Sequence, residues 1–158
     1  MGMYRISVFV HLLGACVWIG GMIFLAAVVL PGLRRAVDED TRRAILADAG
    51  YRFRTIGWIV LVAMLVTGLY NLAVRGVSLG MLLSGSGDLV DRARWKLGLM
   101  TTVMIVSAVH DFWLGPRAVD AATETERDRL RRAASWVGRV NLLLALLLVW
   151  LGLRIVRG

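Results

Sequence analysis

The amino-acid sequence predicts an all-α integral membrane protein, a four-helix bundle with short polar helical extensions. Two observations predict this fold class. The 158-residue chain is 58% apolar with a mean hydropathy of +0.70, which is more apolar surface than a soluble domain of this length can bury. The apolar residues also fall into four runs, each long enough for the roughly 20 residues that cross a bilayer. We expect one transmembrane domain over residues 1–158.

The four predicted spans follow one another in chain order. The first, at about 6–30, is longer than the apolar part of a signal peptide and is not followed by a cleavage site, so we expect it to be retained. Pro31 and Gly32 should end this span, and Gly115 and Pro116 should end the third. The remaining predicted spans cover about 56–74, 95–114 and 137–156.

Charged residues between the spans predict short polar helices outside the membrane. Acid–base pairs at helical spacing follow the first span and precede the last, and such pairs support solvated helices. The glycine-rich connection 76–88 is partly apolar, which predicts a loop or a short surface helix at the membrane interface. The pairs are Asp38–Arg42, Glu39–Arg43, Glu124–Arg127 and Asp128–Arg132.

The distribution of arginines predicts the orientation. The stretches 32–55 and 115–139 carry six arginines each, and the opposite side carries seven basic residues in all. The positive-inside tendency therefore places both arginine-rich stretches in the cytoplasm and both termini outside, in a multi-pass protein of a bacterial cytoplasmic membrane. These loops account for the net charge of +8, and no motif indicates nucleic acid as a partner.

The stretch HLLGACVWIGG at 11–21 places a histidine inside the first apolar run. Ionisable residues within a membrane are costly and are typical of functional sites. His11 shares one helical face with Gly14 and Trp18, and small residues on that face allow another helix to approach. His11 should therefore point into the bundle, where its imidazole needs a metal, a haem or a neighbouring helix as partner.

Methionines on the other spans are candidate partners for this histidine. Met100 and Met104 place two thioethers on one face of the third span, and Met64, Thr67 and Asn71 form a stripe on the second. Thioethers with an imidazole suit Cu(I), and one thioether with an imidazole also suits haem iron. Ordinary packing is the alternative role for these methionines.

The second histidine, His110, lies at a different depth. At 1.5 Å per residue, His11 lies about 8 Å and His110 about 22 Å below the start of its helix, so simple bis-histidine ligation of one upright haem is not expected. Asp111 should not face His110, because i,i+1 residues diverge on an α-helix. Lys96 opens the third span and can reach the interface, where with Arg94 it could meet haem propionates.

Other kinds of site are excluded or lack support. The single cysteine, Cys16, excludes an internal disulfide and a cysteine-based zinc site. The stretch 84–88 lacks the lysine and the flanking strand of a phosphate-binding loop, and neither histidine belongs to a catalytic triad pattern.

Three segments resemble the first three helices of the copper-resistance D (CopD) family. These are HLLGACVWIGGMIFLAAVVLP at 11–31, YRFRTIGWIVLVAMLVTGLYN at 51–71 and KLGLMTTVMIVSAVHDFWLGPR at 96–117. The resemblance covers nearly the whole chain and implies a membrane protein that moves or handles copper.

A related pattern is that of the HemJ-type protoporphyrinogen oxidases, which are small haem-b membrane proteins. This resemblance implies haem and redox chemistry. The last helix departs from the pattern, since GRVNLLLALL lacks the acidic and proline residues expected after its asparagine. The positions that carry the resemblance are His11, Lys96, His110, Arg139 and Asn141.

Together these observations predict copper transport or homeostasis at a His/Met site near the outer membrane face. In this prediction His11 holds Cu(I) with Met100 or Met104, and Lys96 and His110 mark the path or its inner end. The alternative is a haem-b redox protein with His11 as an axial ligand, and the third possibility is a metal-free structural or assembly protein.

The sequence does not decide whether the protein is an enzyme; catalysis is not the first expectation, and an enzyme would be a haem-dependent oxidoreductase. The expected partners are the lipid bilayer and a copper ion or haem, and a homodimer stays open. The predicted metal-binding residues are His11, Met100, Met104 and His110, and the predicted cofactor-binding residues are His11, Trp18, Asn71, Arg94 and Lys96.

Overall fold

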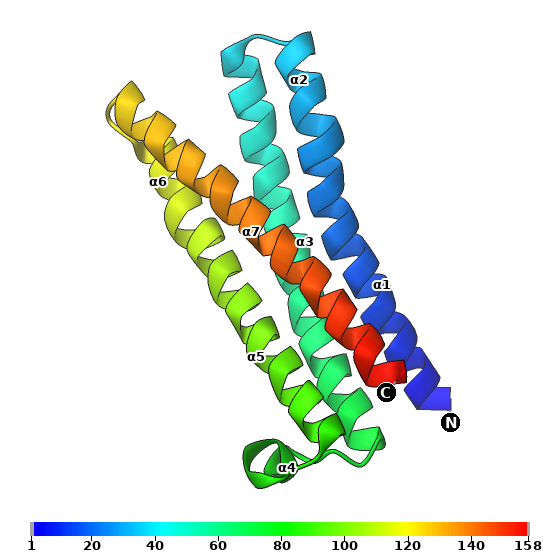
Figure 1. Ribbon diagram of the computed structural model, residues 1–158. Helices are drawn as coiled ribbons and strands as arrows, with labels where there is room; N and C mark the ends of the chain where they lie inside the picture. The colour runs from blue at the N-terminus through cyan, green and yellow to red at the C-terminus, as the bar shows by residue number, and fades with distance from the viewer. Residues whose placement is uncertain (1, 158) are drawn as a thin grey trace. The chain divides into compact units, whose positions relative to one another are not determined.

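The structure, a computed structural model, describes residues 2–157, with side chains described as far as Ile155. Residues 2–157 are helical apart from short connections and contain no strand, so the predicted all-α class is confirmed (Figure 1). The elements are α1 (Gly2–Phe24), the π-helical segment η1 (Leu25–Val29), α2 (Leu30–Ala36), α3 (Glu39–Val74), α4 (Leu79–Ser84), α5 (Asp88–Ala108), the π-helical segment η2 (Val109–Leu114), α6 (Gly115–Asp120) and α7 (Glu124–Arg157).

Four continuous helices are long and apolar enough to cross a membrane. Their outer surfaces expose large apolar side chains such as Phe9, Ile59 and Leu143, which water would solvate poorly and lipid solvates well. The chain is therefore a multi-pass membrane protein. The predicted spans at 6–30, 56–74 and 95–114 lie within three of these helices, and the fourth, at 137–156, begins within the last helix and extends one residue beyond Ile155. The helices are Gly2–Ala36, Glu39–Val74, Asp88–Asp120 and Glu124–Ile155.

The chain divides into two compact units, Met1–Gly76 and Val77–Gly158. In the first unit α1 packs along α3, as the blue and cyan helices of Figure 1 show. The two helices are antiparallel, because residues later in α1 contact residues earlier in α3. His11 contacts Gly68, and three residues later Gly14 contacts Met64.

Glycines bring α1 and α3 close together. A Cβ atom at Gly14 would lie 2.9 Å from Met64 Cγ, and one at Gly21 would overlap the ring of Phe53. On α3, Gly57 lies under Trp18, which is almost fully buried. Small residues at a helix interface allow the close van der Waals packing that holds helices together in lipid.

In the second unit α5 packs along α7. Ala93 and Val103 on α5 and Ala145 on α7 are the most deeply buried residues of this unit. One hydrogen bond between buried side chains joins the two helices, from Asn141 Nδ2 to Ser107 Oγ at 2.9 Å. The connection 76–88, predicted as a loop or a short surface helix, forms the six-residue helix α4.

The two prolines do not end their helices, so the prediction that they would is wrong. The chain stays helical to Ala36 after Pro31 and to Asp120 after Pro116. Proline normally breaks a helix because its ring collides with the carbonyl four residues earlier. Here a wider π-helical turn precedes each proline, and the residue directly before it bonds five residues back. These bonds run from Leu30 N to Leu25 O and from Gly115 N to His110 O.

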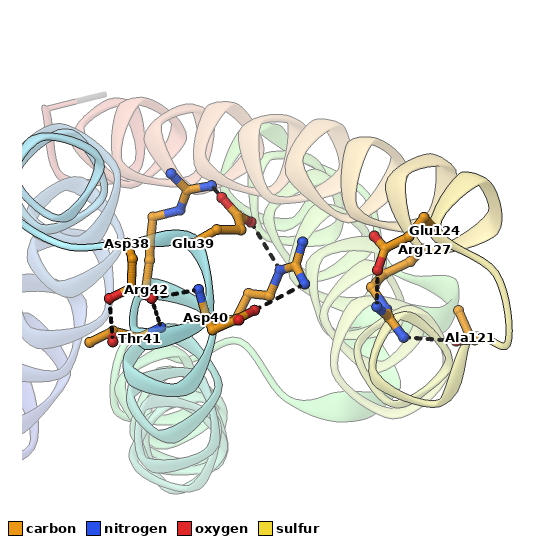
Figure 2. Close-up of polar contacts among 9 residues, drawn as sticks. Asp38, Glu39, Asp40, Thr41, Arg42, Ala121, Glu124 and Arg127 are labelled. Atoms are coloured by element: carbon orange, nitrogen blue, oxygen red, sulfur yellow. Dashed lines mark hydrogen bonds and ion pairs between the residues drawn. The ribbon is translucent and has the colours of Figure 1, made fainter.

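The polar segment after the first span is not a separate helix but the first turns of α3. Asp38 caps this helix, since its carboxylate accepts hydrogen bonds from the backbone N–H groups of Thr41 at 2.9 Å and Asp40 at 3.0 Å (Figure 2). The hydrogen bond from the Thr41 N–H lowers the pKa of Asp38. Asp38 therefore caps the helix, and the ion pair with Arg42 that the spacing predicts is replaced by a pair between Arg42 and Glu39.

Ion pairs at helical spacing support both polar extensions. Arg43 Nε lies 3.0 Å from Glu39 Oε1, and Arg127 NH1 lies 2.7 Å from Glu124 Oε1, so these two predicted pairs are confirmed (Figure 2). Arg127 also donates to the carbonyl of Ala121 at 3.0 Å, which ties the start of α7 to the turn before it.

The two units repeat the same order of parts. In each, a long helix passes through a π-helical turn and a proline to the tetrapeptide Arg-Ala-Val-Asp, at 35–38 and at 117–120, and a short connection leads into a second long helix. Each second helix contains Gly-Leu, at 68–69 and 152–153, near its end, and Val-Arg-Gly closes each unit.

The close packing of α1 on α3 gives a first prediction. Gly21→Ala should lower the free energy of unfolding by about 1–3 kcal/mol, because the new methyl group overlaps the Phe53 ring. Gly20→Ala is the matched control, since a Cβ there meets nothing within 4 Å and alanine favours helix. Unfolding in detergent micelles with increasing dodecyl sulfate measures both. Equal behaviour of the two variants, or no recovery on adding Phe53→Leu to Gly21→Ala, would contradict this packing.

Candidate functional site

His11 lies on the face of α1 that packs against α3. Its ring lies over Gly68, where a Cβ atom would come within 3.2 Å of His11 Cε1. Its Nδ1 atom lies 3.0 Å from the hydroxyl oxygen of Thr67. The predicted inward-facing stripe is present in this unit, since Gly14 and Trp18 on the same face are buried against α3.

The hydrogen bonds of Thr67 determine which nitrogen of His11 carries the proton. The Thr67 hydroxyl has one hydrogen, and it donates to the carbonyl of Ala63 at 2.7 Å within its own helix. With that hydrogen donated within α3, the oxygen accepts from His11, which favours the tautomer with the hydrogen on Nδ1. In the neutral ring, the lone pair is then on Nε2.

Further polar groups surround this pair on the same interface. Ser7, one turn before His11, donates to the Thr67 carbonyl at 3.5 Å. Asn71, one turn after Thr67, has a buried Oδ1 with no hydrogen-bond partner among the residues that the structure describes. Ser7, His11, Thr67 and Asn71 therefore form a polar cluster at one end of the α1–α3 pair.

A thioether lies one turn deeper along the same interface. Met64 is only 7% exposed and contacts Gly14, three residues after His11 on α1. The sequence placed Met64 on the stripe with Thr67 and Asn71 but did not identify it as a ligand. Met64 lies one turn before Thr67 and Gly68 on α3, and these are the two residues that contact His11. This spacing is the sequence signal that places the sulfur on the same helix face as the contacts of His11.

The second unit contains the other predicted ligands. Met100 is buried and Met104 is partly buried, four residues apart on α5. Lys96, also on α5, places its Nζ atom against α7 at Gly152, where a Cβ would lie 3.1 Å away. Lys96 occupies the position in the second unit that His11 occupies in the first. Each residue lies at the same distance along the chain before the proline of its unit, Pro31 or Pro116.

Arg94 holds α4 in place. Its Nε donates to the carbonyl of Leu82 at 2.7 Å and one NH2 bond reaches the carbonyl of Met81 at 3.2 Å, while NH1 pairs with Asp91 at 2.9 Å. A third backbone bond reaches the carbonyl of Gly85. The guanidinium thus binds carbonyls at the end of a short helix, and its predicted contact with a cofactor stays a prediction.

His110 contacts its neighbour in sequence, against the expectation for an α-helix. Its Nδ1 lies 2.9 Å from Asp111 Oδ1. Both residues belong to the π-helical segment η2, whose wider turn changes the angle between successive side chains. The expectation that Asp111 faces away is therefore wrong, and the π-helical turn after Ala108 is the reason.

The predicted site residues are divided between the two units. His11, Trp18 and Asn71 share the α1–α3 interface, while Arg94, Lys96, Met100, Met104 and His110 belong to the second unit. No group of three or more histidine, cysteine, aspartate or glutamate residues that could hold a metal ion occurs in the described part of the chain. A metal at His11 must therefore use other donors, such as thioethers.

Comparisons with known proteins give a family but no activity. The family described as "Domain of unknown function (DUF4149)" matches residues 13–127. An "Uncharacterized protein" of Aquifex aeolicus (strain VF5) is 33% identical over 157 residues, which cover 99% of this chain and 97% of the relative. No solved structure matches the chain. None of these comparisons points to the CopD or HemJ families.

Proposed function

The chain belongs to the DUF4149 family, whose description names no activity, and we propose from its own residues that it handles monovalent copper at His11. Copper is the cargo in this proposal rather than a resident cofactor. The protein lies in the cytoplasmic membrane with both termini outside, as its loop arginines indicate. The CopD resemblance of the first three spans supports the same function.

One observation carries the proposal, and it is the hydrogen bond from His11 to Thr67. Histidines that bind metals usually donate their other ring N–H to a fixed acceptor, which sets the tautomer and the orientation of the ring. Thr67 is such an acceptor, because its own hydrogen is bound to Ala63. His11 therefore directs an Nε2 lone pair from a ring held at a fixed angle.

A buried sulfur donor on the same interface is Met64. Imidazole and thioether together suit Cu(I), a soft cation, better than the hard cations that need carboxylates. Met64 lies one helical turn from His11 along the α1–α3 interface. Met100, Met104 and His110 belong to the second unit, and their part in handling copper stays a prediction.

Removal of the imidazole should abolish Cu(I) binding. We expect purified His11→Ala to hold no Cu(I) in competition with a chromogenic Cu(I) chelator, while the wild type binds it. Met81→Leu, which changes an exposed thioether outside every predicted ligand set, is the control and should still bind. Equal Cu(I) occupancy of the wild type and His11→Ala would contradict the proposal.

Removal of the Thr67 hydroxyl should weaken binding without removing a ligand. Thr67→Val keeps the shape of the side chain but leaves His11 Nδ1 without its acceptor. Loss of such a supporting partner lowers metal affinity by about 10–100-fold. Thr67→Ser retains the hydroxyl and should bind within a few-fold of the wild type. If valine and serine have the same effect, the hydrogen bond does not orient the ligand.

Haem b is the second candidate, because the same Nε2 lone pair suits an axial position on haem iron. A visible spectrum of the purified protein separates the two. We expect no Soret band for a copper protein. A Soret band that His11→Ala abolishes would favour haem, and absence of both copper and haem would favour a structural or assembly role.

A further inference from the structure

Three basic residues meet in the second unit where α5 begins and α7 ends. Arg92 NH1 donates to the backbone carbonyl of Arg154 at 2.8 Å, which places the Arg92 guanidinium at the last turns of α7. One turn further along α5, Lys96 Nζ lies 3.1 Å from the position that a Cβ atom would take at Gly152. Both side chains therefore cross from α5 to the same stretch of α7. We call Arg92, Lys96 and Arg154 the basic cluster.

The lysine of this cluster is directed into the helix pair. Lys96 follows the buried Ala93 by three residues and precedes the buried Met100 by four, so it shares their face of α5. A lysine near a membrane surface usually extends along apolar surface until its amine reaches water. The amine of Lys96 instead lies against α7, where Gly152 has no side chain to exclude it.

The basic cluster carries more positive charge than its acidic neighbours balance. Asp88 Oδ2 lies 3.7 Å from Arg92 NH2, and the Asp88 side chain is 94% exposed to solvent. Asp91, also in the first turn of α5, pairs with a different arginine at 2.9 Å. Within the described part of the chain, the side chains of Lys96 and Arg154 make no hydrogen bond or ion pair. Charge without a counterion is costly beside lipid, so the cluster indicates a bound anion.

Two exposed tryptophans locate the cluster at the level of the lipid headgroups. Trp95 is next to Lys96 on α5, and Trp150 lies two residues before Gly152 on α7. Tryptophan is enriched where a membrane meets water, because its ring is apolar and its N–H is polar. The anionic groups that a bilayer itself holds at this level are those of its lipid headgroups.

We propose that the basic cluster binds the headgroup of an anionic phospholipid. Arg92 offers a planar fork of N–H donors that matches two phosphate oxygens, and Lys96 adds a compact positive charge one turn away. Arg154 contributes a third charge from the end of α7. A headgroup with its own cation binds less well, because that charge is repelled by the cluster. The bound lipid links the start of α5 to the end of α7.

Native mass spectrometry of the full chain, released from detergent micelles, tests this site. The delipidated protein is offered equal amounts of phosphatidylglycerol and phosphatidylcholine with the same acyl chains. We expect the wild type to retain phosphatidylglycerol in preference. Each cation near a membrane surface strengthens binding to anionic lipid by about 5-fold, so Arg92→Gln combined with Lys96→Gln should lower the preference by about 25-fold.

The matched control is Arg34→Gln combined with Arg35→Gln. It removes two positive charges from the last turn of α2, in the first unit, and should keep the wild-type preference. His11→Ala should also keep it, because the lipid site does not depend on the proposed copper site. If the double variant of the cluster does not fold, Arg154→Gln changes an exposed side chain and should lower the preference by about 5-fold.

Three results would overturn the proposal. The first is equal retention of the two lipids by the wild type, which needs no variant to establish. The second is an equal loss of preference in the cluster variants and in the α2 control, since the lipid would then respond to net charge alone. The third is displacement of phosphatidylglycerol by an excess of inorganic phosphate, which would assign the cluster to a soluble anion.

Discussion

Lipid forms no hydrogen bonds, and this constraint shapes the whole chain. Each backbone N–H and C=O group in the membrane needs a partner within its own helix, which leaves long uninterrupted helices as the available structure. Apolar attraction does not hold these helices together, because lipid tails are as apolar as their side chains. Close contact must do so instead, and Gly14, Gly21 and Gly57 provide it in the first unit.

The same constraint explains how each histidine is held. An imidazole inside the membrane is stable only with hydrogen-bond partners. His11 finds a hydroxyl whose hydrogen is already donated, and His110 finds a carboxylate. Two different acceptors thus produce the same tautomer. In that tautomer the lone pair of the neutral ring is on Nε2, the nitrogen further from the histidine's own backbone.

Hydropathy and spacing predicted the parts of this fold that depend on composition alone. Four long apolar helices were predicted because apolar length is what a bilayer selects, and the inward face of α1 was found because Gly14 and Trp18 recur at helical spacing. The π-helical turns were missed, since their effect depends on backbone geometry around Pro31 and Pro116. The contact between His110 and Asp111 was missed for the same reason. Thr67 was predicted as part of a stripe on the second span. Its role as the hydrogen-bond acceptor of His11 depends on the direction of its own hydroxyl hydrogen, which the sequence does not contain.

Comparison of the two units shows which residues are shared by both helix pairs and which differ between them. Gly68 on α3 lies against the imidazole of His11, and Gly152 on α7 lies against the amine of Lys96. The side chain that lies against the glycine therefore differs between the two helix pairs, while the glycine itself is the same in both. A chain built from two such hairpins carries two independent positions at which nitrogen chemistry can diverge without loss of the helix pair.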